Sequence, residues 1–277
     1  MSNALLNVSD LRLRYPGVGF RGTSPEVLRG VSIDIVPGET LGVVGESGSG
    51  KTTLGRAVLG LAKPTGGTIK FGGRDITHLS SRERRPLARD IQVIFQDPYT
   101  SLNPSLQIAD ILAEPLIAQG TSSQEARNSV RQLLDSVGLP ANAAQRYPKE
   151  FSGGQRQRIA IARALALKPR LIVCDEPVSA LDLTTQSRVL DLLIELQRRT
   201  GVAYLFITHD LSVVRHISHR VTVMYQGELV ETGQTADVTT NPQHEYTRSL
   251  LLASPTADPD RQAERRAARR LLRLASS

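Results

Sequence analysis

Short apolar runs alternate with helical periodicity along most of the chain. The runs have the length of strands and end at charged or turn residues. Unbroken apolar strands that alternate with helices are typical of a parallel sheet covered by helices on both faces. We therefore expect an α/β fold whose central strands cover 41–44, 90–96, 171–177 and 203–210.

The middle of the chain is helical in pattern, which predicts an inserted helical lobe over about residues 97–160. Ser122 and Glu125 have the spacing of a capping box, and Gly138 is suited to ending the helix that Ser122 begins. Apolar positions also repeat at helical spacing outside this lobe. The expected helices cover 51–61, 105–116, 122–139 and 184–201.

Further strands flank this alternating core. A Gly/Pro loop separates the strands expected at 5–14 and 27–36, and another strand followed by a turn covers 67–76. Residues 220–233 have the pattern of a hairpin that turns near Gln226 and Gly227.

Composition excludes several classes of protein. The 277-residue chain has one cysteine, Cys174, so an internal disulfide framework and a multi-cysteine metal site are excluded and a reducing compartment is favoured. We see no signal-peptide pattern and no apolar stretch near the ~18 residues of a membrane span.

The net charge of +7 owes much to the tail at 261–277, which contains six arginines and one glutamate. A helix on anionic lipid and a solvated terminus both account for this tail.

Residues 45–53, GESGSGKTT, match the pattern G-x-x-x-x-G-K-[ST] in full. The motif follows a predicted strand and opens a predicted helix, where backbone N–H groups can wrap phosphate. Lys51 is suited to reach the β- and γ-phosphates, and the Thr52 hydroxyl to ligate Mg²⁺. A solvated Gly/Ser turn is the alternative, but the full match predicts a nucleoside triphosphate site. Its expected contacts are Gly45, Glu46, Ser47, Gly48, Ser49, Gly50, Lys51, Thr52 and Thr53.

Polar side chains end three other predicted strands. Asp175 is suited to hold Mg²⁺ and Glu176 to act as general base on the attacking water. His209 is expected at the γ-phosphate because strand ends in such sheets face the ligand crevice, with a structural histidine as the alternative. For Gln96, a bridge between Mg²⁺ and the water and a simple strand cap both stay open. We thus predict Glu176, His209 and Gln96 as catalytic, and Thr52, Gln96 and Asp175 as metal ligands.

A second glycine-bearing helix start occurs in EFSGGQRQRIAIARAL, residues 150–165. A helix N-terminus with free N–H groups is an anion site, so a second phosphate contact is expected here. Apolar residues behind this start are suited to anchoring the helix in the core. The expected contacts are Ser152, Gly153, Gly154 and Gln155, and the expected anchors are Ile159, Ile161 and Leu165.

These motifs occur in one order along the chain, together with SALD at 179–182. In this set and order the chain resembles the ATP-binding cassette (ABC) ATPases over roughly residues 5–255. The resemblance implies a P-loop NTPase fold with a RecA-like core, an antiparallel β subdomain and the helical lobe. It also implies that Tyr15 stacks on adenine, with strand packing as the alternative, and that Asp182 lies at a dimer interface. Phe151 replaces the usual first leucine of the second motif, at a position that packs.

Two stretches resemble one branch of this family. Residues 89–116 and 241–251 are similar to ATPases of di- and oligopeptide importers and of related nickel and glutathione importers. Some members carry a C-terminal cysteine cluster suited to iron–sulfur, but no cysteine follows Cys174, so we expect no such cluster. The chain therefore resembles the cluster-free "F" type of ATPase subunit. We expect an ATPase domain over 1–255 and a C-terminal extension over 236–277.

The resemblance implies ATP and Mg²⁺ as cofactors and a head-to-tail dimer with a second ATPase chain, identical or different. Ser152 and its glycines would then contact the ATP that Lys51 of the other chain holds. Two permease subunits, docked beside Gln96 and residues 97–115, and an extracytoplasmic solute-binding protein are the other implied partners. We expect a peripheral protein at the cytoplasmic face of the cell membrane that drives peptide import.

The sequence also leaves alternatives to peptide import. The same machine could import nickel or glutathione, and a permease-free ABC ATPase, such as a phosphonate-degradation accessory protein, is a further alternative. A nucleic-acid-handling ATPase of this superfamily would usually have two cassettes or a long coiled coil. This chain has one cassette and no heptad run, and its positive charge lies largely in one tail, so no nucleic-acid partner is expected.

Overall fold

The computed structural model describes residues 4–15, 25–97 and 101–253, so the arginine-rich tail predicted at 261–277 lies outside the described residues. One of its sheets is antiparallel, with the strand order β2-β1-β4-β5. The strands of this sheet are β1 (Leu6–Arg14), β2 (Glu26–Ile35), β4 (Gly66–Phe71) and β5 (Arg74–Asp75).

The second sheet has the strand order β10-β9-β3-β8-β7-β6. Its strands run parallel from β9 to β6, and β10 pairs antiparallel with β9. The parallel core that the alternating pattern predicts is therefore present. The strands of this sheet are β3 (Thr40–Val44), β6 (Ile91–Ile94), β7 (Leu171–Asp175), β8 (Ala203–Thr208), β9 (Arg220–Tyr225) and β10 (Glu228–Gln234).

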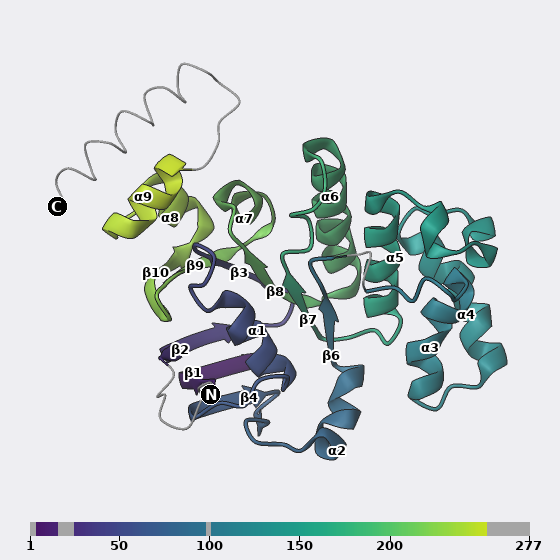
Figure 1. The fold of residues 1–277 in the computed structure, drawn as a ribbon, viewed down its shortest axis with the longest axis horizontal. Coiled ribbons are helices and arrows are strands. Elements are labelled where there is room, and N and C mark those ends of the chain that lie inside the picture. The colour runs from purple at the N-terminus through teal and green to yellow at the C-terminus, as the bar shows by residue number, and fades with distance from the viewer. Residues whose placement is uncertain (1–3, 16–24, 98–100, 254–277) are drawn as a thin grey trace.

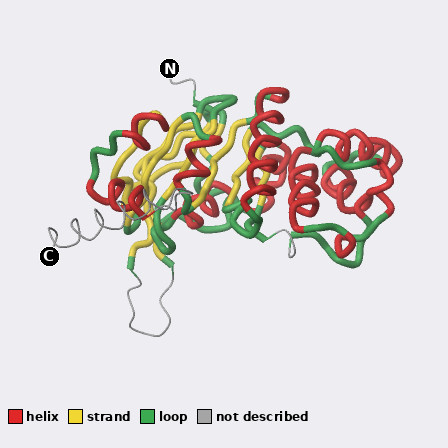
Figure 2. Tube along the Cα trace, turned by 90° about the horizontal axis from the view of Figure 1, so that it is seen from above, coloured by secondary structure: helices red, strands yellow, loops and turns green. Residues whose placement is uncertain are grey.

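Helices α3, α4 and α5 gather at one end of the molecule, beyond the edge strand β6 (Figure 1), and Figure 2 shows the strands gathered away from them. They lie in the part of the chain where a helical lobe is expected, although the boundaries of that lobe and of the 1–255 domain stay a prediction. No helix in the described part of the chain has both the length and the apolar character that a bilayer crossing requires. The helices are α1 (Lys51–Leu59), α2 (Ser81–Arg84), α3 (Ile108–Ala118), α4 (Ser123–Ser136), α5 (Gly153–Leu165), α6 (Leu183–Thr200), α7 (Leu211–Ile217), α8 (Thr235–Thr240) and α9 (Glu245–Ala253), with 3₁₀ turns at Arg85–Arg89, Ala141–Gln145 and Pro148–Glu150.

Side chains of β8 alternate between two separate cores. Leu205 and Ile207 of β8 pack in the cluster that contains Leu54 of α1, whereas Phe206 of the same strand packs in the cluster that contains Ile159 of α5. Because successive side chains of a strand point to opposite faces, α1 and α5 lie on opposite faces of the second sheet. The first glycine motif and the second are thus separated by the sheet.

The structure contains the capping box, the hairpin turn and the helix end at residue 201 that the sequence predicts. The Ser122 hydroxyl accepts from the Glu125 N–H while the Glu125 carboxylate accepts from the Ser122 N–H, which completes the capping box of α4. Gln226 and Gly227 both have positive φ, 47° and 87°, as a two-residue hairpin turn requires. Gly201 ends α6 in the left-handed conformation.

The structure differs from the predicted elements at the start of α3 and at the short helices α2, α7, α8 and α9. The helix expected at 105–116 begins at Ile108, because the Asn103 side chain accepts from the Ser105 N–H and holds a turn before it. Helices α2, α7, α8 and α9 were not expected. Among them, α7 has seven residues, and the Asp210 side chain caps it by accepting from the Ser212 N–H. A helix of this length shows less than a full hydrophobic repeat.

Arg220, at the start of β9, connects the two sheets. Its guanidinium donates two hydrogen bonds to the Asp34 carboxylate on β2, each 3.2 Å long, and a third to Glu39 at 3.1 Å. Glu39 is only 6% exposed, and its other oxygen accepts from the Val36 N–H at 2.8 Å. A carboxylate buried to this degree depends on its partners, because an unpaired charge is strongly disfavoured away from water.

Replacing Arg220 with alanine should lower the free energy of unfolding by about 3 kcal/mol, because Glu39 would stay buried without its cation. Urea denaturation followed by circular dichroism measures this loss. Arg199→Ala is the matched control, since Arg199 pairs at 3.5 Å with Glu195, whose side chain is 65% exposed. That variant should lose less than about 0.5 kcal/mol. Similar losses in both variants would contradict the role given to Arg220.

Candidate nucleotide-binding site

The predicted site residues meet at one edge of the second sheet because its parallel strands all end there. β3 ends directly before residues 45–53, which we call the phosphate loop, and β8 ends directly before His209. β7 ends at Asp175, which pairs with Ile207 and so lies level with the end of β8. The sheet therefore brings together segments that are far apart in the sequence.

The phosphate loop packs so closely on the body of the protein that two of its glycines are required. A Cβ at Gly45 would lie 2.1 Å from the carbonyl oxygen of Met224 on β9. Gly50 has a φ of 105°, and a Cβ there would lie 2.9 Å from the carbonyl oxygen of Val27 on β2. Strands β9 and β2 thus set the path of the loop. Its middle residues Glu46, Ser47 and Gly48 are exposed.

Lys51 folds back onto its own loop. Its Nζ donates to the carbonyl oxygens of Gly45 and Glu46, both at 2.7 Å, and the residue is 5% exposed. Burial lowers the pKa of Lys51, although the nearby carboxylates of Glu176 and Asp175 oppose this shift. A buried cation at the mouth of α1 is suited to binding phosphate oxygens.

Two of the three residues expected to hold Mg²⁺, Thr52 and Asp175, lie in contact. The Thr52 hydroxyl donates to Asp175 Oδ1 at 2.9 Å. Burial raises the pKa of Asp175, although the bond from Thr52 opposes the shift. The buried Ser49 hydroxyl in the same loop has no hydrogen-bond partner among the described residues. Because hard oxygen donors suit Mg²⁺ and an unpaired hydroxyl suits a phosphate, these residues fit a magnesium–triphosphate ligand.

Glu176 and His209 form a pair across the ends of β7 and β8. His209 Nδ1 lies 3.2 Å from Glu176 Oε2, and the two side chains are 55% and 18% exposed. Glu176 has a φ of 48°, and its N–H donates to the Ile207 carbonyl oxygen at 2.9 Å. A left-handed backbone at a residue other than glycine is strained and persists where its surroundings enforce it. The structure therefore brings together the expected general base and the expected γ-phosphate contact.

Gln96 and Tyr15 flank this group. β6 ends at Ile94 in parallel register with β7, so the exposed Gln96 lies level with Glu176 along the sheet edge. Tyr15 follows β1, is 40% exposed, and its hydroxyl lies 3.5 Å from Thr53 Oγ1 at the start of α1. Tyr15 thus lies beside the phosphate loop and Gln96 level with Asp175 and Glu176, which we call the acid pair, while the roles of Tyr15 and Gln96 stay predictions.

The second glycine motif begins α5, on the other face of the sheet from α1. The Ser152 hydroxyl accepts from the Gln155 N–H at 3.3 Å, and Gln155 Oε1 accepts from the Ser152 N–H at 3.0 Å. Gly154 packs on α6 so closely that a Cβ would lie 2.3 Å from Thr185 Cγ2. Asp182 caps α6 by accepting from the Thr185 N–H at 3.0 Å. Ser152 and Asp182 therefore lie at neighbouring helix starts, away from the phosphate loop of the same chain.

Comparison with known proteins agrees with this geometry. The family described as "ABC transporter" matches residues 28–179, which is more than half of the chain. The chain belongs to the ABC transporter family. The family match supports the nucleotide interpretation of the phosphate loop and the acid pair, whereas the role of each individual residue stays a prediction.

Relatives within this family include importer subunits. The chain is 52% identical over 247 residues to the oligopeptide transport ATP-binding protein OppD of Mycobacterium bovis. It is also 52% identical over 267 residues to the glutathione import ATP-binding protein GsiA of Shigella flexneri serotype 5b. These alignments cover 88% and 95% of this chain but 40% and 43% of the relatives, so the chain spans about two fifths of their length. The resemblance to peptide and glutathione importer ATPases is confirmed, while the cluster-free subtype stays a prediction.

Two solved structures have the same fold. Residues of cbiO1 from Clostridium perfringens superpose with a TM-score of 0.78 at 27% identity, covering 90% of this chain and 96% of that one. The dimeric ATP-binding cassette MJ0796, bound to ADP and Pi, gives 0.73 at 30% identity, covering 83% and 98%. The predicted P-loop NTPase fold with its antiparallel subdomain is thereby confirmed.

Two contacts of the phosphate loop come from residues that no motif marks. The Tyr246 hydroxyl on α9 accepts from the Glu46 N–H at 2.9 Å, and the Gly227 N–H in the β9–β10 turn donates to the Ser49 carbonyl oxygen at 3.0 Å. The spacing of nearby residues predicts neither contact, because each joins segments that are distant along the chain.

Replacing Asp175 with asparagine should raise the thermal unfolding midpoint of the ligand-free protein at pH 7. The pKa of Asp175 is raised in the folded state, so its ionised form is disfavoured there, and asparagine keeps an oxygen for Thr52 while removing the charge. Mg²⁺-dependent ATP binding should weaken by about tenfold or more in the same variant. Differential scanning fluorimetry and equilibrium titration measure the two effects. Asp135→Asn, at an exposed position of α4, should change neither, and a lower midpoint for Asp175→Asn would contradict the argument.

Proposed function

We propose that this chain is the ATP-hydrolysing subunit of an importer and that it works as a head-to-tail dimer on a membrane permease. The observation that carries the proposal is the Glu176–His209 pair beside the Thr52–Asp175 contact. Nucleotide binding alone does not need a carboxylate at that strand end, whereas hydrolysis needs a base for the attacking water.

In this reaction Glu176 accepts a proton from water while the water oxygen attacks the γ-phosphorus and the bond to the bridging oxygen breaks, giving ADP and phosphate. His209, 3.2 Å away, orients the Glu176 carboxylate. The Lys51 ammonium has three N–H donors, and the one that the Gly45 and Glu46 carbonyl oxygens do not use donates to a phosphate oxygen. Thr52 and Asp175 would hold Mg²⁺, which would neutralise charge on the phosphates.

The second phosphate contact comes from another molecule. Gly153 and Gly154 follow Ser152 in the first turn of α5, where the helix N-terminus favours an anion, but α5 lies on the opposite face of the sheet from the phosphate loop. A second ATPase chain, placed head to tail, would bring Ser152 and Asp182 to the ATP held by Lys51. ATP would then join the two chains, and hydrolysis would release them.

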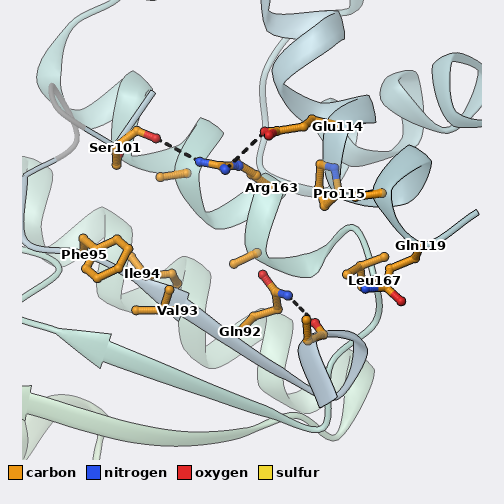
Figure 3. A pocket seen from close by; sticks show the side chains of 14 residues that line it. Gln92, Val93, Ile94, Phe95, Ser101, Glu114, Pro115, Gln119, Arg163 and Leu167 are labelled. Carbon is orange, nitrogen blue, oxygen red and sulfur yellow. Dashed lines mark hydrogen bonds and ion pairs between the residues drawn. The ribbon is translucent and has the colours of Figure 1, made fainter. Parts of the chain in front are cut away.

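A cavity of about 270 Å³ between β6, α3 and α5 is the proposed permease site. Figure 3 shows Arg163 at its wall, donating to the Ser101 carbonyl oxygen at 2.9 Å and pairing with Glu114 at 3.2 Å. Phe95, which is 44% exposed, lines the same cavity one residue before Gln96. An apolar hollow with a few polar groups suits side chains of a short amphipathic helix, and its position would couple docking to Gln96.

The names of the relatives favour peptides or glutathione as the imported solute. The partners of the complex would be the second ATPase chain, two permease subunits and an extracytoplasmic solute-binding protein. The chain would then be a peripheral protein at the cytoplasmic face of the membrane. Nickel import and a permease-free ATPase are the alternatives, and purification of a permease with this chain would exclude the second.

Replacing Glu176 with glutamine should lower ATP turnover by about 10²- to 10⁴-fold, because glutamine does not accept the proton from water. ATP binding should survive, so an ATP-dependent dimer should accumulate and be visible by size-exclusion chromatography. Glu195→Gln is the matched control, since Glu195 is exposed on α6. Unchanged turnover, or no ATP-dependent dimer in Glu176→Gln, would refute the role of Glu176.

Replacing Ala118 with glutamate should reduce copurification of the permease by about tenfold, because it places a charge in the rim of the apolar cavity. Ala118 is exposed and lines that cavity, so the fold should tolerate the change. The basal ATPase rate of the isolated chain should stay within about twofold of wild type. Ala141→Glu, at an exposed position outside the cavity, is the control, and equal copurification of both variants would contradict the docking site.

A further inference from the structure

Tyr246 is the second residue of α9 and touches the phosphate loop from 200 residues further along the chain. Its hydroxyl oxygen accepts a hydrogen bond from the Glu46 backbone N–H at 2.9 Å. This hydrogen bond joins the phosphate loop to a side chain of α9, near the C-terminal end of the described residues. The motif at 45–53 does not predict it, and the chemistry proposed above does not use it.

The contact acts on the same peptide group that holds Lys51. The carbonyl oxygen of Gly45 and the N–H of Glu46 belong to one planar peptide unit and point in opposite directions. Lys51 Nζ donates to that oxygen at 2.7 Å, while the N–H donates to Tyr246 on the opposite side. The Tyr246 hydroxyl therefore fixes the plane of the peptide whose other end positions the phosphate-binding lysine.

Tyr246 is itself held in place by several contacts. Its ring stacks on Tyr225 with centroids 4.2 Å apart, and its N–H donates to His244 Nδ1 at 3.1 Å. The Glu231 carboxylate on β10 accepts from the N–H groups of Gln243 at 2.8 Å and His244 at 3.0 Å, just before α9 begins. The ring also packs against a core cluster that includes Val44, the last residue before the phosphate loop. These contacts place the hydroxyl before any ligand arrives.

We propose that Tyr246 is a positioning residue of the phosphate loop and that α9, through its hydroxyl, sets the ATP affinity of this chain. The inference rests on the proposed function, because it assumes that the loop binds ATP. A loop whose peptide planes are already oriented loses less freedom when the phosphates bind. Without the hydroxyl, the Gly45–Glu46 peptide would have to be ordered at the moment of binding.

The test compares Tyr246→Phe with Tyr225→Phe. Both changes remove one hydroxyl and keep both stacked rings, but the Tyr225 hydroxyl accepts from Gln226 and not from the loop. Losing one hydrogen bond typically changes an equilibrium by about fivefold. Tyr246→Phe should therefore weaken Mg²⁺–ATP binding by about fivefold in equilibrium titration of the full chain, with Tyr225→Phe within twofold of wild type.

Steady-state kinetics and thermal unfolding separate positioning from a general structural role. Tyr246→Phe should raise the KM for ATP by about fivefold with kcat within twofold, and the unfolding midpoints of the two ligand-free variants should agree. Unchanged or tighter ATP binding in Tyr246→Phe, or equal weakening in both variants, would overturn the inference while leaving the proposed function intact. Failure of the wild-type chain to bind ATP would overturn both.

Discussion

Parallel pairing of β3, β8 and β7 forces their carboxyl ends to one edge of the sheet, and the whole candidate site depends on that edge. The phosphate loop, Glu176 and His209 lie in different parts of the sequence. Backbone hydrogen bonds between the strands nevertheless fix how far each segment extends along the strand direction at the sheet edge. Charged groups held this way need little reorganisation when a reaction develops charge, which is where electrostatic catalysis is strongest. The strained backbone of Glu176 is maintained by the same pairing, through the Ile207 carbonyl oxygen.

The sheet that brings the phosphate loop, Glu176 and His209 together also separates the phosphate loop from the second predicted phosphate contact. Alternating side chains of β8 bury α1 on one face and α5 on the other, so the two glycine motifs present their helix starts on different sides. A single chain thus carries both predicted phosphate contacts without joining them. Two copies, or two related chains, would each complete the site of the other. ATP hydrolysis would then require two chains to associate.

Sequence was informative wherever a residue is positioned by its immediate neighbours. The phosphate loop follows a strand and opens a helix, and the Ser122 cap and the Gln226–Gly227 turn depend on spacings of a few residues. Contacts between distant segments had no such signal. Nothing near Tyr246 indicates that its hydroxyl reaches Glu46, and nothing near Arg220 indicates that it would bridge Asp34 and Glu39. Such pairings are decided by the packing of whole elements, which periodicity does not encode.

The Ser49 hydroxyl, buried without a partner among the described residues, bears on the stability of the folded chain. A buried polar group without a partner costs about 1–3 kcal/mol, out of a total stability that is commonly about 5–15 kcal/mol. A ligand that supplies the missing partner binds the folded chain alone and so shifts the folding equilibrium toward it. Bound nucleotide would then stabilise the folded chain, which would open less often to proteases than the ligand-free chain.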